Sequence, residues 1–490
     1  PPDTATPPGD PTLRAVTEIF GAVLGRTAVP PDVPFFALGG SSLAAGRACA
    51  RLAARLDRPV PVAQLYRHPT AAALARWLDT TIAVPSPAAP PTEIPLTPMQ
   101  LVYLTRWLVD PADRTGHCLL TWVIEGSLDR AALAAAVAAV HRRHEPLRAA
   151  YRPDPAPQAQ VVAVPAPVPV VLDPAPSVDD ALAALRAELA GDLDPTTGRV
   201  WRTALAPAGQ ATVFGVAVHH IAFDGASEAV LARDLAAAYA GAMLPPAPAL
   251  HAVRRQHAEP PDALRGELTG VPELRWPADP LDPAPDEPCR VEVRVGPEVL
   301  RAVDALAAAA GVTRFTVLLA QYAASLADVT GQRDFAVGVP VAQRGAGLED
   351  AIGCHLNMVC LRLRGSALDG DPAAVGSVVA RAFATQDVPL RDVLELVAAP
   401  RTGRPPLFQT LFALQDNEIP RMELPGLDTS FHRAPYLDLP LELHTELWPE
   451  DGGLRVEVAF RPDAVGRTTA EALVKLLIDR LHTIPTGERR

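Results

Sequence analysis

The stretch His219-His220-Ile221-Ala222-Phe223-Asp224-Gly225 sets the organisation of this chain. It follows the apolar run 212–218 (TVFGVAV), which predicts a β-strand buried on both faces of a sheet. It precedes residues 226–235, whose pattern predicts a helix. Because successive strand side chains alternate between faces, we expect His219 and His220 to point opposite ways, one packed and one facing a cavity.

This pair of histidines does not indicate a metal site. Adjacent strand residues are poorly placed to bind one ion together, and no H-x-x-x-H or C-x-x-C spacing accompanies them. The cysteines are odd in number and scattered, which predicts neither a disulfide framework nor a zinc site. They are Cys49, Cys118, Cys289, Cys354 and Cys360.

Composition narrows the classes of function. Apolar residues make up 49% of the 490 residues, and the formal net charge of −12 argues against a nucleic-acid partner. No apolar run reaches about 18 residues, so we expect no membrane partner. The simplest nucleotide-binding and serine-hydrolase motifs are absent. The start, Pro1-Pro2-Asp3-Thr4, lacks the pattern of a secretory signal. We therefore expect the cut end of a longer, cytoplasmic polypeptide.

The first 82 residues predict a small helical domain. Thr12 is a candidate cap for an amphipathic helix that ends near Leu24, and a second helix runs from Leu43 to about residue 56. A short turn at 62–66 and a helix from about 70 to 78 follow. These patterns predict a four-helix domain of about 80 residues that can fold alone.

The loop before the second helix reads Leu38-Gly39-Gly40-Ser41-Ser42-Leu43, and this stretch resembles the 4'-phosphopantetheine attachment site of peptidyl carrier proteins. The resemblance aligns Ser42, not Ser41, with the modified serine. A serine at a helix N-terminus would place a phosphodiester near unpaired N–H groups and the positive end of the helix dipole. A plain N-cap role for either serine is the alternative. Arg47, Arg51 and Arg55 form one stripe on the same helix, which is either a solvated face or a docking face.

The pattern HHxxxDG at residues 219–225 resembles the core motif of condensation domains from nonribosomal peptide synthetases. Other stretches resemble further motifs of that family in the family's order, although His355 stands where phenylalanine is usual, and the fourth motif has only a weak match at 251–256. The clearest of these stretches are 95–100 (PLTPMQ), 143–151 (RHEPLRAAY), 335–344 (FAVGVPVAQR) and 352–358 (IGCHLNM). The resemblance implies a fragment of a nonribosomal peptide synthetase, a carrier followed by a condensation domain.

The implied fold is a small all-α four-helix carrier bundle plus a large α/β domain of two chloramphenicol-acetyltransferase-like lobes. Composition and motifs divide the chain into a linker end, the carrier, a Pro-rich linker and two lobes. Their bounds are 1–11, 12–82, 83–94, 95–265 and 266–488.

The resemblance also implies a reaction, amide formation. The carrier would present a donor aminoacyl or peptidyl thioester on phosphopantetheine attached to Ser42, and an amine held on a downstream acceptor carrier would attack it. His220 is the expected catalytic residue, as a base or as a group that positions the amine. Other implied partners are an upstream adenylation domain and a phosphopantetheinyl transferase.

The remaining residues have supporting roles in this interpretation. We expect Asp224 to be structural and paired with Arg344, because a buried carboxylate needs a cation. Gly225 would allow a tight turn, and His219 would pack behind the site. Further candidates are Arg148, to brace the active-site region, and Asn357 and Ser227, to line the cavity.

Two other functions stay open at this point. An epimerisation domain shares HHxxxDG and also follows a carrier, and it would invert the Cα of the tethered residue. A catalytically silent domain of the same fold would only recruit partner proteins. A heterocyclisation domain is disfavoured, since it would replace HHxxxDG with an Asp-rich motif.

Overall fold

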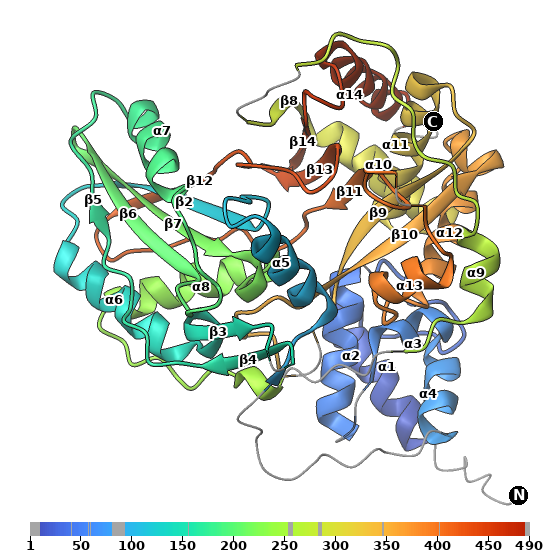
Figure 1. Ribbon diagram of the computed structural model, residues 1–490. Helices are drawn as coiled ribbons and strands as arrows, with labels where there is room; N and C mark the ends of the chain where they lie inside the picture. Colours follow the sequence, from blue (N-terminus) through green and yellow to red (C-terminus); the bar gives the residue numbers. More distant parts are fainter. Residues whose placement is uncertain are drawn as a thin grey trace, which may run out of the picture.

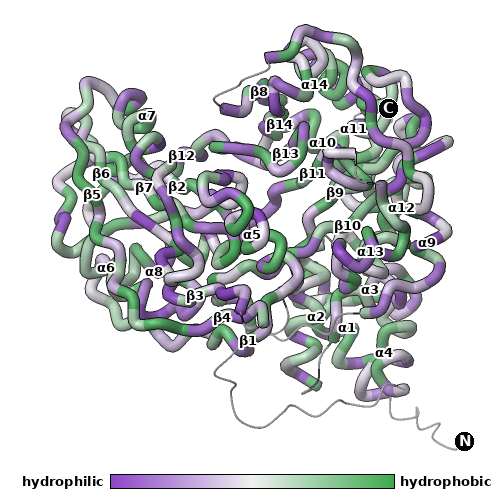
Figure 2. The backbone as a smooth tube through the Cα atoms, in the orientation of Figure 1, coloured by the Kyte–Doolittle hydropathy of each residue, from purple (hydrophilic) through white to green (hydrophobic). Residues whose placement is uncertain are grey.

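The computed structural model describes residues 10–40, 42–56, 58, 60–80, 94–154, 156–252, 258–282, 287–344, 347–400 and 402–485. Figure 1 shows three parts: the helices α1–α4 and two lobes that each contain a sheet. Hydrophobic residues are spread through all three parts (Figure 2), as expected when each part has its own core. Within the described residues no single helix has the length and apolar character to cross a membrane. The helices Pro297–Ala310 and Arg314–Thr330, bent by 104° at the break between them, have sufficient length and apolar character only as a pair.

The N-terminal helical domain consists of α1 (Pro11–Leu24), α2 (Ser42–Leu56), α3 (Val62–Arg67) and α4 (Ala71–Thr80). Its core is formed by the apolar faces of these helices around Phe20, Phe35 and Leu52. Two predictions from the sequence were wrong, the cap of α1 and the form of residues 62–66. Asp10, not Thr12, caps α1, by accepting from Thr12 N at 2.9 Å, and Thr12 Oγ1 donates to Asp79 of α4. The expected turn at 62–66 is the helix α3.

The N-terminal lobe is built on a five-stranded sheet in the order β12-β2-β7-β6-β5. The central strand β7 (Ala211–His219) is antiparallel to β2 (His117–Glu125) and to β6 (Trp201–Ala208). Helices α6 (Arg130–Arg143) and α8 (Gly225–Tyr239) cover one face, and α7 (Val178–Leu189) covers the other. The run 212–218 is therefore buried on both faces, except that Thr212 is half-buried.

Smaller elements complete this lobe. They are β1 (Ile94–Pro95), α5 (Pro98–Val109), η1 (Glu145–Arg148), β3 (Ala149–Arg152), β4 (Gln158–Val161), β5 (Val170–Val171), η2 (His220–Ala222) and η3 (Leu250–Ala252). The expected linker at 83–94 lies outside the described residues except for Ile94, and so does most of the weak fourth motif at 251–256.

The C-terminal lobe has a six-stranded sheet in the order β10-β9-β11-β13-β14-β8. Its strands are β8 (Cys289–Val295), β9 (Asp334–Ala342), β10 (Leu356–Arg364), β11 (Thr410–Leu414), β13 (Leu443–Glu450) and β14 (Gly453–Phe460). Its helices are α9 (Asp262–Leu268), α10 (Pro297–Ala310), α11 (Arg314–Thr330), η4 (Gly365–Leu368), α12 (Pro372–Phe383), α13 (Leu390–Leu396) and α14 (Arg467–His482). The core lies between the sheet and α10, α11, α12 and α14.

One strand from the C-terminal part of the chain belongs to the sheet of the N-terminal lobe. Strand β12 (Asp428–Arg433) comes late in the sequence, yet it pairs with β2 of the N-terminal lobe, with Asp428 opposite Glu125 and Arg433 opposite Leu120. A simple division of the chain into 95–265 and 266–488 therefore does not describe the lobes fully. This crossing fixes the edge of one sheet to the chain of the other lobe.

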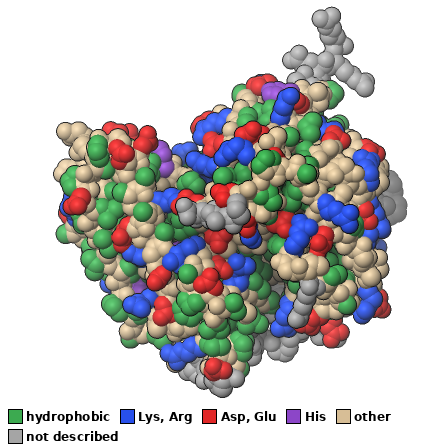
Figure 3. Space-filling model, turned by 45° about the horizontal axis from the view of Figure 1, so that its top comes forward, with side chains coloured by type: hydrophobic (Ala, Val, Ile, Leu, Met, Phe, Trp, Pro, Cys, Tyr) green, Lys and Arg blue, Asp and Glu red, His purple; other side chains and the backbone are tan. Residues whose placement is uncertain are grey.

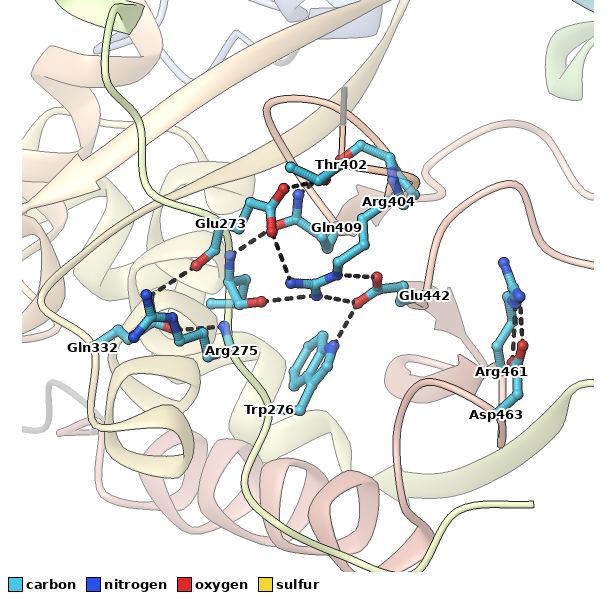
Figure 4. A network of polar contacts seen from close by, with 12 residues as sticks. Glu273, Arg275, Trp276, Gln332, Thr402, Arg404, Gln409, Glu442, Arg461 and Asp463 are labelled. Atoms are coloured by element: carbon cyan, nitrogen blue, oxygen red, sulfur yellow. Dashed lines mark hydrogen bonds and ion pairs between the residues drawn. The ribbon is translucent and has the colours of Figure 1, made fainter. Parts of the chain in front are cut away.

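A polar network holds the segment that follows α9 against the C-terminal lobe (Figure 4). Arg404 forms a bidentate ion pair with Glu442, through distances of 2.8 and 2.7 Å, and also donates to the Leu274 carbonyl. Trp276 Nε1 donates to the same Glu442 carboxylate at 2.7 Å. This part of the chain and α9 itself thus belong to the C-terminal lobe.

The helical domain packs on the C-terminal lobe through aromatic side chains. The ring of Tyr66 on α3 stacks on Phe36 with centroids 4.5 Å apart and meets Phe383 of α12 edge-on at 5.1 Å. Such aromatic pairs contribute about 0.5–1.5 kcal/mol each beyond the area they bury. In Figure 1 this contact brings the start of α2 under the junction of the two lobes.

Candidate active site

His220 lies at the end of the central strand, where the chain turns toward α8. It opens the 3₁₀ turn η2, and its backbone N donates to the Gly116 carbonyl at 2.6 Å. Its ring stacks on Tyr103 of α5, with centroids 4.8 Å apart and 13° between the planes. The side chain is partly exposed to a cavity between the lobes. The stacking holds the imidazole in one orientation toward that cavity.

The protonation state of His220 suits a group that accepts a hydrogen bond. Burial among protein atoms lowers the pKa of His220 below 6.5, and the charges of Asp224 and Glu228 oppose this shift. The imidazole is therefore neutral at neutral pH, with a free lone pair on one ring nitrogen. Such a group accepts a hydrogen bond or a proton from an amine in the cavity.

His219 packs behind the site. It is 3% exposed, and its Nδ1 accepts a hydrogen bond from Ile221 N at 3.1 Å. A Cβ at Gly116 would lie 3.0 Å from this ring, so a larger residue there would push the ring by a few tenths of an ångström. Burial, together with the charges of His117 and His220, lowers the pKa of His219 to about 3.

Acid is expected to destabilise the fold through His219. The unfolded chain binds a proton at this residue below about pH 6.5, whereas the folded protein excludes it down to a pKa of about 3. The free energy of unfolding should thus fall as the pH drops below 6.5, by up to roughly 1.4 kcal/mol per pH unit for this residue. Urea unfolding between pH 7 and pH 5 measures this slope. A His219→Gln variant that kept the wild-type slope would contradict the assignment.

Asp224 joins the two lobes at the start of α8. Its carboxylate caps the helix by accepting from Ser227 N at 3.0 Å, pairs with Arg344 at 2.5 Å, and accepts from His355 N at 3.0 Å. Burial opposes the charged form, but Arg344, the charge of His355 and the Ser227 bond together lower the pKa of Asp224 to about 2. The pair that the sequence predicted is present, and it links α8 to the segment between β9 and β10.

Ser227 and Gly225 serve the same junction. The Ser227 hydroxyl accepts from Gly353 N at 3.1 Å and from Arg344 at 2.9 Å, and it is fully buried. A Cβ at Gly225 would lie 3.1 Å from the Asn417 amide nitrogen, so glycine allows that segment to approach closely. Ser227 therefore fastens the lobes and is not among the residues that line the cavity.

Breaking the Asp224–Arg344 pair is expected to destabilise the protein strongly. Arg344→Ala leaves a carboxylate that is only 6% exposed without its cation, which costs about 3–5 kcal/mol. The matched control is Arg333→Ala, because the Arg333–Asp369 pair is 55% and 60% exposed and should contribute less than about 1 kcal/mol. Denaturant unfolding of both variants is the measurement. Equal losses in the two variants would refute the buried pair as a stabilising contact.

Two other predicted site residues, Arg148 and Asn357, are not among the described residues that line the large cavity. Arg148 is the last residue of η1 and lies beside His141. Burial lowers the pKa of His141, and the Arg148 charge lowers it as well. The Asn357 amide donates to the carbonyls of Gln386 and Val388 at 2.9 and 2.7 Å. These bonds hold the segment 386–388 against β10. Their proposed roles stay predictions.

The cavity reaches from the helical domain to His220. Its volume is about 1760 Å³, and its walls come from all three parts of the chain. The helical domain contributes Gly39, Gly40 and Arg47, beside the start of α2 at Ser42. Seen from another side, Figure 3 shows the surface hollowed between the two lobes. A group attached near the start of α2 therefore has a continuous space before it that leads to His220.

The loop before α2 has the form that a bulky attachment needs. Gly39 has φ +95°, a value that favours glycine, and a Cβ at Gly40 would come within 2.2 Å of the Phe35 ring. Both glycines are thus required by the tight turn over Phe35. The turn presents the N-terminal end of α2 at the wall of the cavity.

Sequence reasoning missed several residues of this site. Tyr103 orients His220, and His444 and Glu446 line the far part of the cavity, yet none lies in a motif. Residues 444 and 446 share one face of their strand, but Thr445 between them is polar as well, so no alternation of polar and apolar residues marked them.

Comparison with known families agrees with this arrangement. The Condensation domain family matches residues 91–486, and the family described as Phosphopantetheine attachment site matches residues 14–78. Tyrocidine synthase 3 of Brevibacillus parabrevis is 28% identical over 96% of this chain, and the probable non-canonical nonribosomal peptide synthetase CymA of Salinispora arenicola is 30% identical over 99%. The chain spans only 8% and 7% of the lengths of these two relatives.

A solved structure shows the same two-lobed fold. The complex of the X-domain and OxyB from teicoplanin biosynthesis contains a chain that is 26% identical, with a TM-score of 0.65. The match covers 84% of this chain and all of that chain. The predicted fold class, a helical domain followed by two lobes of this type, is confirmed.

Proposed function

Since the chain belongs to the condensation-domain family of nonribosomal peptide synthetases and carries a phosphopantetheine attachment domain ahead of that domain, we propose that it joins a donor held at Ser42 to an acceptor amine through an amide bond. A carrier and a condensation domain imply contacts with other synthetase domains and with thioester substrates. The single observation that supports the proposal most is the cavity that runs from the start of α2 to His220.

Ser42 is the residue that we assign to the cofactor. The turn at Gly39 and Gly40 and the N-terminal end of α2 fit a phosphodiester there, because the helix end supplies N–H groups and a positive partial charge. When bound, phosphopantetheine supplies a thioester whose carbonyl carbon is already activated toward an amine. Arg47 lines the same cavity one turn along α2, where its charge favours an anionic group.

His220 would act on the attacking amine. Its neutral imidazole, held by Tyr103, accepts a hydrogen bond from the amine and so directs the nitrogen lone pair toward the donor. Asp224 and Arg344 would act indirectly, because they fix α8 and the opposing lobe around the cavity.

The direction of transfer follows from the domain order. The helical domain precedes the condensation domain and packs near one mouth of the cavity, so we assign it the donor. The acceptor carrier would dock at the other mouth. An adenylation domain upstream and a phosphopantetheinyl transferase that modifies Ser42 complete the proposed partners. The expected cytoplasmic location stays a prediction.

A single-turnover assay tests the proposal. The chain is loaded at Ser42 with an isotopically labelled peptidyl-phosphopantetheine and mixed with an aminoacyl acceptor carrier, and intact masses are followed. Movement of the label to the acceptor, with a new amide, supports the proposal. Exchange of the donor α-hydrogen with solvent and no transfer would establish epimerisation instead. Neither event across a range of donors and acceptors would favour a domain that only recruits partners.

A further inference from the structure

A polar cluster lines the cavity on the C-terminal lobe, apart from His220. It consists of His444 and Glu446 on β13, Gln415 after β11, and Tyr436 in the segment that joins β12 to β13. Glu446 is 4% exposed, and its carboxylate accepts from Gln415 Nε2 at 2.7 Å and from the Tyr436 hydroxyl at 2.8 Å. Among the described residues, Glu446 has no ion-pair partner, so neutral donors alone hold this buried carboxylate.

His444 stands beside this carboxylate with unused hydrogen-bonding capacity. The residue is 5% exposed, its Nε2 has no hydrogen-bond partner in the described part of the chain, and its ring meets Tyr436 edge-on at 5.7 Å. Burial lowers the pKa of His444 to about 4, so the ring is neutral at neutral pH. A buried polar atom without a partner is rare in a folded protein and needs an explanation. A ligand in the cavity supplies one.

No neighbouring arginine in the described part of the chain forms an ion pair with the Glu446 carboxylate. Arg433, whose charge acts on Glu446, does not line the cavity; it is ion-paired with Glu228 of α8 and lies over the Trp448 ring at 3.7 Å. Arg404 and Arg461, which do line the cavity, are paired with Glu442 and Asp463. Burial raises the pKa of Glu446; the hydrogen bonds from Gln415 and Tyr436 and then the Arg433 charge oppose that effect, and the Glu457 charge adds to it. A buried carboxyl of this kind gains most from a positively charged hydrogen-bond donor.

The segment that joins β12 to β13, which carries Tyr436, lies away from the helical domain. In Figure 1 the segment between β12 and β13 crosses between the lobes above α5, whereas α1–α4 lie below it. The hollow in Figure 3 opens on that upper side. If the helical domain delivers the donor, as proposed above, the group that reaches this cluster belongs to the acceptor.

We propose that Glu446, Tyr436 and His444 form a side-chain subsite that selects an acceptor amino acid with an amine-bearing, cationic side chain. This inference rests on the proposed function for the assignment to the acceptor. The ammonium would donate to the Glu446 carboxylate and to the free nitrogen of His444, and Tyr436 and Gln415 would keep the carboxylate in place. An apolar side chain of the same length would leave these groups buried and unpaired, which is how such sites discriminate.

Lysyl and norleucyl acceptors form the matched pair of probes, because they differ chiefly in the terminal amine. Affinities of non-hydrolysable lysyl- and norleucyl-pantetheine amides are measured by calorimetry with the wild-type chain. Binding of the lysyl probe at least tenfold tighter is expected. Equal affinities would overturn the inference, whatever the outcome of the transfer assay.

Variants separate the cluster from general effects. Glu446→Gln keeps the shape but removes the charge and replaces one acceptor oxygen with an N–H donor, to which the Tyr436 hydroxyl or a turned Gln415 amide can still bond. It should reduce the lysyl preference to less than about threefold while norleucyl binding stays within about twofold. Tyr436→Phe is a milder second variant and should reduce the preference in the same direction. A lysyl preference that survives both changes would place the recognition elsewhere.

The transfer assay distinguishes the two proposals. Amide formation with both acceptors at equal rates would support the proposed function and overturn the subsite. A lysyl preference in binding without amide formation would support the subsite and overturn the proposed function.

Discussion

Replacing His220 with alanine is expected to slow amide formation by about 10²–10⁴-fold. The substitution removes the one imidazole that both lines the cavity and stacks on Tyr103, so the attacking amine loses its hydrogen-bond acceptor. The measurement is the single-turnover transfer of a labelled donor from Ser42 to an acceptor carrier. The rate should fall while the unfolding free energy stays near that of the wild type, because His220 is partly exposed and faces the cavity.

Two controls sharpen this result. His219→Gln alters the neighbouring histidine, which faces away from the cavity and keeps an acceptor for Ile221 N, so transfer should change by less than about tenfold. A pH profile tests whether the neutral imidazole is needed, since both a general base and a hydrogen-bond acceptor would give a rate that falls as His220 becomes protonated. Transfer at the wild-type rate in His220→Ala would remove this residue from the mechanism.

Replacing Ser42 with alanine is expected to abolish attachment of phosphopantetheine altogether. No other serine begins α2, and the hydroxyl is the atom that the phosphodiester requires. Incubation with coenzyme A and a phosphopantetheinyl transferase, followed by intact-mass analysis, measures the attachment. The wild type should gain one group, and Ser42→Ala should gain none.

Ser41 provides the matched control for this prediction. It precedes Ser42 directly and lies outside the described residues. Ser41→Ala should be modified as the wild type is, because the resemblance places the attachment one residue later. Modification of Ser42→Ala together with its loss in Ser41→Ala would shift the assignment to Ser41.

The local part of the site was predictable because it depends on short-range patterns. The apolar run before His219 and the glycine after Asp224 define a strand and a helix start, and both elements are present. The Asp224–Arg344 pair was predictable because a buried carboxylate at that place needs a cation, and the family resemblance narrowed the candidates. Hydrophobic patterning is readable within a few residues, and the need of a buried carboxylate for a cation follows from a single charge.

The rest of the site depends on contacts between distant segments, which no local pattern encodes. Strand β12 joins a sheet whose other strands come some 200 to 300 residues earlier, through pairing with β2. Tyr103 resembles any other apolar residue of an amphipathic helix until the fold places it on His220. Arg148 lies beside His141, and its proposed role in bracing the active-site region stays a prediction.

The measurement that tests the central claim most directly is an experimental structure of the chain loaded at Ser42 with a non-hydrolysable amide analogue of a donor. We expect the arm to run from the start of α2 through the cavity. The donor carbonyl carbon should lie within roughly 6 Å of the His220 ring, one hydrogen bond and one attack distance of about 3 Å each. An arm that lies outside the cavity, or a carbonyl carbon far beyond that distance in a well-ordered complex, would contradict the account.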